Sequence, residues 1–232
     1  MQMNILVFKH VPFEGPAAIA DWAGSRGHTI SSVDAYAGTE LAMPDSYDML
    51  VVMGGPMNIY EEDKYPWLVA EKAAIRAAID AGKYVVGVCL GAQLIADVLD
   101  APVIKGKETE IGWFEINRTA ECPDGFPLPD SLRVYHWHGE TFHLPEGAVH
   151  IASGEACTNQ GFLYDGRVLA LQCHLETTRE SMNALIEACE EDIHSDCPCI
   201  QTVATMRAEP DSSFDRMQAV LFRLLDHITE RE

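Results

Sequence analysis

The sequence has few basic residues: 16 Lys and Arg stand against 36 Asp and Glu among 232 residues, a formal net charge of −20. A chain this acidic repels phosphate backbones and anionic lipids, which excludes nucleic acids and membrane surfaces as expected partners. It has no hydrophobic run approaching the roughly 18 residues of a membrane-spanning helix. Hydrophobic residues still make up 47% of the chain, enough for a sizeable core, which excludes the disordered and collagen-like classes.

The chain also lacks a paired cysteine framework, because its seven cysteines are an odd number scattered along the sequence. Residues Met1–Asn4 lead directly into the apolar segment Ile5–Phe8, without the basic and long hydrophobic regions of a signal peptide. We therefore expect a protein of the reducing cytoplasm. No internal repeat, low-complexity segment or linker divides the chain, and we expect a single domain over residues 1–232.

Hydrophobic periodicity in the first hundred residues alternates between strand and helix. Three short apolar segments are predicted to be buried strands: Ile5–Phe8, Asp48–Met53 and Tyr84–Val88. Amphipathic segments between and after them are predicted to be helices: 16–25, 67–81 and 92–99. Continuous apolar strands separated by helices are typical of a parallel sheet with helices on both faces.

The sequence changes character after Pro102, where segments typical of β-strands with hairpin turns follow one another: 112–117, 132–137, 148–152 and 161–173. Two helices are expected at about 178–194 and 214–228, with a loop at Ser195–Ser213 between them. The predicted fold class is therefore α/β. We expect a three-layer sandwich with a mostly parallel central sheet, helices on both faces and a smaller antiparallel β portion.

A single cysteine stands between a predicted strand and a predicted helix. Gly87 and Gly91 lie two residues before and after Cys89, an arrangement that matches a nucleophile elbow with Cys in place of Ser. The start of a helix offers free N–H groups and the positive end of the helix dipole, which favour the nucleophilic thiolate. A closely packed structural cysteine would have the same local sequence, so the prediction of a nucleophile depends on a partner group.

His174 and Glu176 supply that partner, at the end of the apolar segment Val168–Leu171. Parallel α/β sheets place their sites at the C-terminal ends of strands, where Cys89 is also expected. A carboxylate near a histidine can orient its ring, and a histidine so held takes a thiol proton and later protonates a leaving amine. Alone, the pair would be interpreted as a polar strand end, but together with Cys89 it predicts catalysis.

Gly54-Gly55-Pro56 follows the predicted strand Asp48–Met53. Glycines at this position let backbone N–H groups face the same cleft, and the N–H groups of Gly55 and Leu90 would form an oxyanion hole with two donors. Loss of one such donor typically costs about 3–4 kcal/mol in the transition state. An ordinary turn would have the same three residues.

With these residues assembled, the chain resembles a class I, triad-type glutamine amidotransferase domain. The matching motifs are Gly54-Gly55-Pro56, G-V-C-L-G-A-Q at 87–93 and Q-C-H-L-E at 172–176, in the order typical of that family. Further segments resemble the stand-alone proteins called GMP synthase-like: 54–63, E-I-G-W-F at 110–114 and W-H-G-E-T-F at 137–142. The resemblance covers nearly the whole chain and implies the flavodoxin-like fold of the family.

The resemblance implies a role for each matching residue. Cys89 corresponds to the nucleophile, His174 to the general base and acid, and Glu176 to the group that orients His174. The substrate-contacting positions implied are Gly54, Gln93, Trp137, Gly139 and Glu140. No metal and no cofactor is implied.

The implied reaction is hydrolysis of the glutamine side-chain amide. It would pass through a γ-glutamyl thioester on Cys89 and release glutamate and ammonia. The chain has no P-loop-like segment for ATP and no synthetase domain, so the ammonia would serve a separate synthetase protein.

Three other functions remain open on the sequence. The same triad would serve a γ-glutamyl hydrolase or peptidase, whose leaving amine is a peptide or conjugate. A metal-binding protein would use three histidines that lie near one another in sequence, His136, His138 and His143, together with the two thiols of Cys197 and Cys199. A catalytically silent regulatory module would keep the fold and leave Cys89 unreactive.

Overall fold

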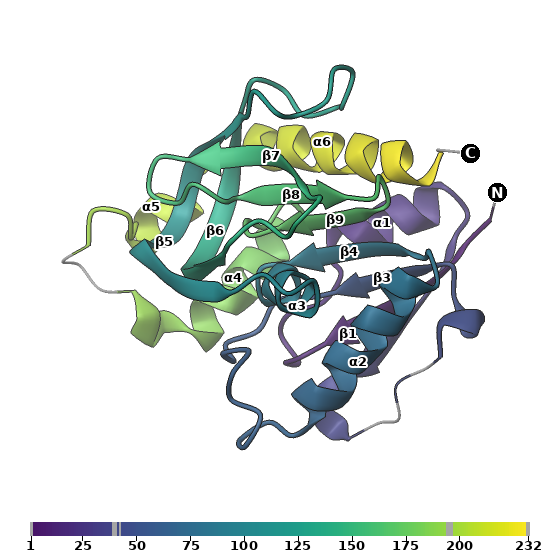
Figure 1. The fold of residues 1–232 in the computed structure, drawn as a ribbon. Helices are drawn as coiled ribbons and strands as arrows, with labels where there is room; N and C mark the ends of the chain where they lie inside the picture. Colours follow the sequence, from purple (N-terminus) through teal and green to yellow (C-terminus); the bar gives the residue numbers. More distant parts are fainter. Residues whose placement is uncertain (1, 39–40, 42, 194–196, 231–232) are drawn as a thin grey trace.

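A computed structural model describes residues 2–38, 41, 43–193 and 197–230, and its strands form one nine-stranded sheet in the order β2-β1-β3-β4-β9-β8-β7-β5-β6 (Figure 1). The first half of this sheet is parallel. Its members are β2 (Thr29–Asp34), β1 (Asn4–Lys9), β3 (Met49–Val52), β4 (Tyr84–Val88) and β9 (Val168–Leu171). The interior strands are short and apolar because both of their faces are covered, as the sequence predicts.

The second half of the sheet is antiparallel and is as large as the parallel half. Its members are β8 (Gly161–Tyr164), β7 (Val149–Gly154), β5 (Val103–Arg118) and β6 (Ser131–Phe142). The described strands make four parallel and four antiparallel pairings, so the prediction of a mostly parallel sheet with a smaller antiparallel portion is wrong in proportion. The cause is β5, which runs for 16 residues and pairs with β6 over most of its length.

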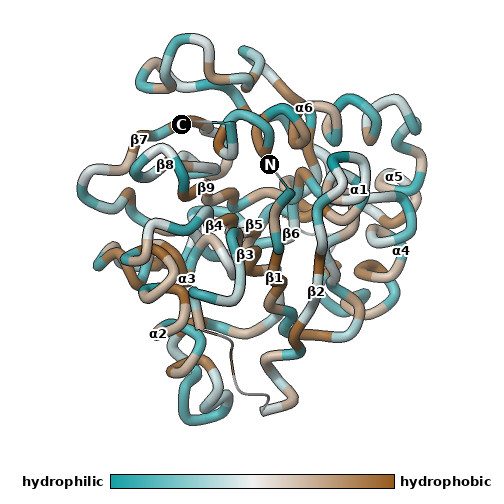
Figure 2. Tube along the Cα trace, turned by 90° about the vertical axis from the view of Figure 1, so that its right-hand side faces the viewer, coloured by the Kyte–Doolittle hydropathy of each residue, from teal (hydrophilic) through white to brown (hydrophobic). Residues whose placement is uncertain are grey.

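Helices cover both faces of the sheet, which confirms the predicted α/β layers (Figure 1). On one face, α1 (Ala18–Ser25), α4 (Arg179–Ala188), α5 (Val203–Arg207) and α6 (Asp211–Thr229) share a hydrophobic cluster. On the other face lie α2 (Trp67–Asp80) and α3 (Leu90–Val98). Figure 2 shows hydrophobic residues concentrated in the central strands and hydrophilic ones in the connecting loops.

Three short 3₁₀ helices complete the described elements: η1 (Ala35–Ala37), η2 (Pro44–Ser46) and η3 (Glu190–Asp192). The helix predicted at 178–194 is divided, because α4 ends at Ala188 and η3 follows it; His194 lies outside the described residues. The loop predicted at Ser195–Ser213 is also wrong in part. It contains α5 and the first turn of α6, while residues 195–196 lie outside the described part of the chain.

No helix within the described ranges is long and apolar enough to cross a membrane. All seven cysteines fall within those ranges and are free thiols. The parallel order brings the C-terminal ends of β1, β3, β4 and β9 to one edge of the sheet, where the segments that carry the predicted motifs begin.

Candidate active site

Cys89 occupies a sharp turn between β4 and α3. Its backbone is held at φ 52° and ψ −108°, a left-handed conformation that L-residues rarely adopt, and its N–H donates to the Leu171 carbonyl at 2.8 Å. A side chain on Gly91 would overlap the Val52 carbonyl oxygen, and one on Gly87 would come within 2.6 Å of the Gly91 carbonyl oxygen. The two glycines therefore let α3 begin directly after the nucleophile position, at Leu90 rather than at the predicted residue 92.

The structure places His174 and Glu176 beside Cys89. β9 ends at Leu171, and the chain continues through His174, whose N–H donates to the Tyr135 carbonyl at 2.8 Å. Nδ1 of His174 donates a hydrogen bond to Oε1 of Glu176 at 2.8 Å, and this bond fixes the orientation of the ring. Nε2 of His174 has no hydrogen-bond partner among the described residues and borders the same pocket as Cys89. It is the ring nitrogen available for proton transfer.

Burial and neighbouring charged groups act in opposite directions on the pKa of His174. His174 is 3% exposed, and burial lowers its pKa, but the attraction of Glu176 and the interaction with Cys89 outweigh burial and hold that pKa well above its ordinary value. A raised pKa favours an imidazolium next to the sulfur. An imidazolium at this position could give its proton to a leaving group.

The loop predicted to supply one oxyanion-hole donor is held by a buried pair, His10 and Glu71, that the sequence did not predict. Nδ1 of His10 donates to the Gly54 carbonyl at 2.9 Å, and Nε2 of His10 lies 2.8 Å from Oε1 of Glu71. Because a trans peptide directs its C=O and N–H to opposite sides, this bond aims the Gly55 N–H away from His10. The N–H groups of Gly55 and Leu90 donate to no group within the described residues, so both can receive an oxyanion.

We expect His10→Gln to lower the free energy of unfolding by about 3–5 kcal/mol, because it leaves Glu71 buried without its partner. Both side chains are fully buried. Burial lowers the pKa of His10, but Glu71 outweighs burial and raises it above 6.5. The contribution of the His10 charge is therefore fully present below pH 6.5 and is lost as pH rises through the folded-state pKa. Urea unfolding of wild type and variant at several pH values above and below 6.5 measures it; a difference that grows with rising pH would contradict the pairing.

A pocket of about 320 Å³ opens over Cys89, close to the lower end of the size range of small-molecule sites. Four of the predicted substrate-contacting residues line it: Gln93, Trp137, Gly139 and Glu140. Gly54, the fifth, is not among the lining residues, because its carbonyl faces His10 and its Cα lies beneath other side chains. The glycine that borders the pocket in that motif is Gly55.

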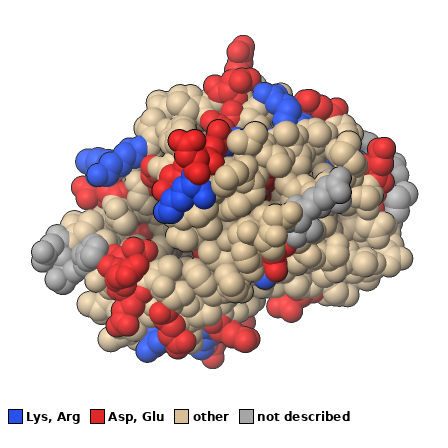
Figure 3. Space-filling model, turned by 90° about the horizontal axis from the view of Figure 1, so that it is seen from below, with Lys and Arg blue, Asp and Glu red and all other residues tan. Residues whose placement is uncertain are grey.

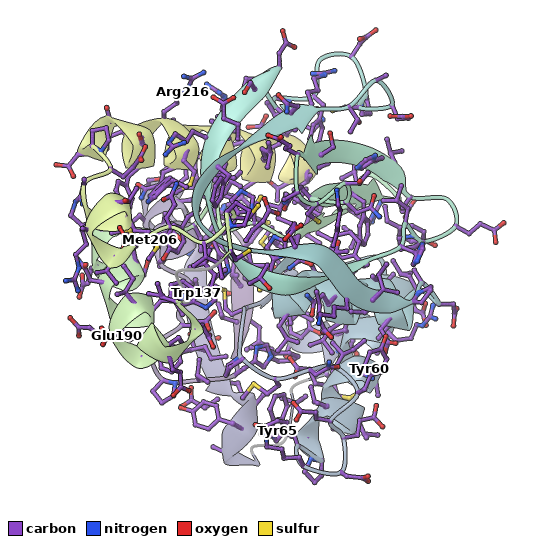
Figure 4. All side chains as sticks on the ribbon, turned by 90° about the vertical axis from the view of Figure 1, so that its left-hand side faces the viewer. Tyr60, Tyr65, Trp137, Glu190, Met206 and Arg216 are labelled. Carbon is purple, nitrogen blue, oxygen red and sulfur yellow. The ribbon has the colours of Figure 1, made fainter. Side chains whose placement is uncertain are left out.

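The pocket wall formed by β6 is held by hydrogen bonds. The Trp137 carbonyl oxygen lies 3.6 Å from Sγ of Cys89, and Nε1 of Trp137 donates to Asp192, next to the Glu190 segment (Figure 4). Asn58 donates to Glu140 at 2.7 Å and so links the Gly-Gly-Pro loop to β6. The wall can therefore hold the polar head of a small substrate above the sulfur.

The pocket residues that were missed in the sequence include Glu14, Asn58 and Asp192. Glu14 follows β1 and therefore comes from the same sheet edge as Cys89; its place after a parallel strand was the signal available in the sequence. Asn58 was within a quoted motif without an assigned role. No local sequence pattern marked Asp192 as a pocket residue, because it reaches the pocket only through the position of η3 after the end of α4.

The structure contains a group of possible metal ligands, which shares only His138 with the set predicted from the sequence. His136 and His138 are buried on β6, and Glu110, His138 and Cys157 have potential ligand atoms that all lie within 4.8 Å of one another. His143 is exposed, and the thiol of Cys197 contacts Glu108 and Thr109, so the predicted set is not assembled; Cys199 is likewise outside this group. Nδ1 of His138 donates to the Glu140 carbonyl, so this group also orders the pocket wall.

Comparison with known proteins places these features in a family. A model described as "Glutamine amidotransferase class-I" matches residues 17–189. The chain is 37% identical to the glutamine amidotransferase-like protein YfeJ of Salmonella typhimurium over 98% of each chain. It is 33% identical to one subunit of the glutamine-hydrolyzing GMP synthase of Thermoplasma acidophilum (57% of this chain, 64% of that one). It is 26% identical to gamma-glutamyl peptidase 3 of Arabidopsis thaliana (62% and 60%).

A solved structure shares the whole fold. The crystal structure of a glutamine amidotransferase from Thermotoga maritima superimposes with a TM-score of 0.88, at 30% identity and with 100% of both chains covered. The matched family segment contains every residue of the predicted triad. The chain belongs to the class I glutamine amidotransferase family.

Proposed function

We propose that this protein hydrolyses the side-chain amide of glutamine, or of a γ-glutamyl compound, through a γ-glutamyl thioester on Cys89. The observation that carries the proposal is that Cys89, His174 and Gly55 line one pocket, while the N–H groups of Gly55 and of Leu90, the residue after Cys89, donate to no other described residue. A pocket of about 320 Å³ suits an amino-acid amide.

The proposed first half-reaction forms the thioester. The Cys89 thiolate attacks the amide carbon, and the oxyanion accepts hydrogen bonds from the N–H groups of Gly55 and Leu90. His174, held as imidazolium by Glu176, gives its proton to the amide nitrogen, the C–N bond breaks and ammonia leaves. A carbon–sulfur bond to Cys89 replaces the carbon–nitrogen bond.

The second half-reaction releases glutamate. His174 takes a proton from water, the hydroxide adds to the thioester, and the sulfur leaves as thiolate. The thiolate is then paired again with the imidazolium of His174. No step requires a group from outside the chain except water and the substrate.

The direct test measures glutamate release from L-glutamine and from a γ-glutamyl dipeptide side by side, with Cys89→Ala as the blank. Turnover of glutamine that the blank lacks supports glutaminase activity. Turnover of the dipeptide with little on glutamine supports the second candidate, a γ-glutamyl hydrolase, which the similarity to gamma-glutamyl peptidase 3 favours. If neither compound is turned over and Cys89 does not react with a glutamine-like electrophile, the chain is a silent module.

We expect Glu176→Gln to lower kcat by about 10²- to 10⁴-fold, less than loss of the nucleophile, because the isosteric amide no longer stabilises the imidazolium. The attraction of Glu176 raises the pKa of His174, so its removal lowers that pKa. The high-pH limb of the rate profile, where the imidazolium loses its proton, should move to lower pH in the variant. A pH–kcat profile with an unmoved limb would contradict the role of Glu176.

A separate synthetase is the partner that we propose for the ammonia. The similarity to the Thermoplasma acidophilum protein, whose name describes one subunit of a glutamine-hydrolyzing GMP synthase, supports this part of the proposal. Co-purification of the chain from its native cell extract, followed by a measurement of ammonia-dependent activity in the captured protein, tests it.

A further inference from the structure

Glu14 lines the pocket, and its nearest charged neighbours are His174, Glu176 and His10. It lies in the loop between β1 and α1, and no hydrogen bond or ion pair connects its carboxylate to another described residue. A side chain on Gly54 would overlap Oε2 of Glu14 and would lie 3.3 Å from Cε1 of His174. The Glu14 carboxylate therefore packs against the Gly54 backbone, close to Cε1 of the His174 ring.

The position of Glu14 defines which part of a substrate it meets. In the proposed reaction His174 protonates the departing nitrogen, so the leaving group lies beside His174. Nε2 of His174 is buried without a hydrogen-bond partner in the described chain, and His174 lines the pocket together with Glu14. In the proposed complex the β6 wall from Trp137 to Glu140, which also lines the pocket, would hold the glutamyl part. Glu14 thus borders the leaving group.

The lining of the pocket is rich in carboxylates. It includes those of Glu14, Glu140 and Asp192, the imidazoles of His138 and His174, and no Lys or Arg. Glu140 is held by Asn58 and Asp192 by Trp137, so Glu14 is the carboxylate that remains available. Burial raises the pKa of Glu14, with a further contribution from Glu176, and the opposing attractions of His174 and His10 do not cancel this rise, so a further cation beside Glu14 would stabilise its carboxylate. Acidic residues are also spread over the face of the molecule shown in Figure 3.

We propose that Glu14 forms a leaving-group subsite for a cation, and that the preferred substrates are γ-glutamyl amides of amines that carry a second, positively charged group. Glutamine lies outside this class, because its leaving group, ammonia, has no second charged group for Glu14 to hold. The bonds made and broken are those of the proposed function, on which this inference rests. The leaving amine takes the proton of His174 while its distal ammonium is held by Glu14.

The test compares three γ-glutamyl amides of similar length with leaving amines of different charge. They are the amides of 1,4-diaminobutane (cationic), n-butylamine (neutral) and 4-aminobutanoate (anionic). For wild type we expect kcat/KM to fall in that order. Glu14→Gln should lower kcat/KM for the cationic amide by about 10- to 100-fold, the size of one hydrogen bond to a charged group, and leave the neutral amide within about threefold. Glu146→Gln, which removes an exposed carboxylate outside the pocket, should change none of the three.

Two other outcomes would overturn the inference. A wild-type enzyme that hydrolyses the neutral or anionic amide at least as well as the cationic one has no cation subsite. An equal loss on all three amides in Glu14→Gln would place Glu14 at the α-ammonium of the glutamyl part instead. Failure of the proposed function is distinguishable, because no amide would then be hydrolysed in a Cys89-dependent way.

Discussion

Cys89→Ala should abolish turnover of glutamine and γ-glutamyl amides while leaving the fold intact. Loss of the nucleophile in a triad hydrolase lowers kcat on the order of 10⁶-fold, which would bring this reaction below detection. Alanine keeps the Cβ, so the left-handed backbone at position 89 experiences the same strain in both proteins. The side chain lost is one thiol, 8% exposed, at the floor of an open pocket. The expected change in thermal midpoint is therefore small.

The control for this variant is Cys199→Ala, which removes a half-buried thiol that does not line the pocket. It should retain wild-type turnover. Glutamate release, ammonia release and a thermal melt on the same preparations separate chemistry from folding. A Cys89→Ala protein that melts normally and still turns over substrate would refute the thioester mechanism.

Gly91→Ala should prevent the elbow from forming and lower stability by more than about 4 kcal/mol, in the range that marks a specific structural conflict. The added methyl group would overlap the Val52 carbonyl oxygen, a backbone atom of a central strand that cannot rotate away. β3 and α3 would have to move apart, and their packing holds Cys89 at the sheet edge. Chemical denaturation measures the loss where the variant folds, and the yield of folded protein measures it where the variant does not.

A matched substitution distinguishes this conflict from the general effect of replacing glycine in a helix. Gly24 lies in α1 with no atom within 4 Å of an added Cβ. Gly24→Ala should leave stability unchanged or raise it by about 0.5–1 kcal/mol, because alanine favours helix. If Gly91→Ala were as harmless as Gly24→Ala, close contact between β3 and α3 would not be what the glycine provides.

The elbow could be predicted from sequence because its requirements are local. A buried strand, a cysteine, two flanking glycines and a helix lie within ten residues, and each has a direct physical reason. His174 and Glu176 could be predicted for the same reason, since they lie two positions apart. The structure places these groups at one sheet edge because parallel strands end on the same side.

The buried pair that holds the proposed oxyanion-hole loop could not be predicted in this way. His10 and Glu71 are separated by 61 residues, and each alone looks like a polar residue beside a hydrophobic one. Their meeting depends on how α2 packs over β1 and β3. The proportion of antiparallel sheet was missed for a related reason: the hydrophobic pattern marks where strands occur, but the 16-residue length of β5 depends on its pairing with β6.

The central claim is that Cys89 carries the glutamyl group as a thioester, and mass spectrometry of acid-quenched enzyme tests it most directly. Enzyme mixed with excess γ-glutamyl substrate and quenched within one turnover should gain the mass of one γ-glutamyl group. Peptide analysis should locate that group on Cys89, and hydroxylamine should remove it. An unmodified Cys89 during rapid turnover, or a γ-glutamyl group on another residue, would contradict the account.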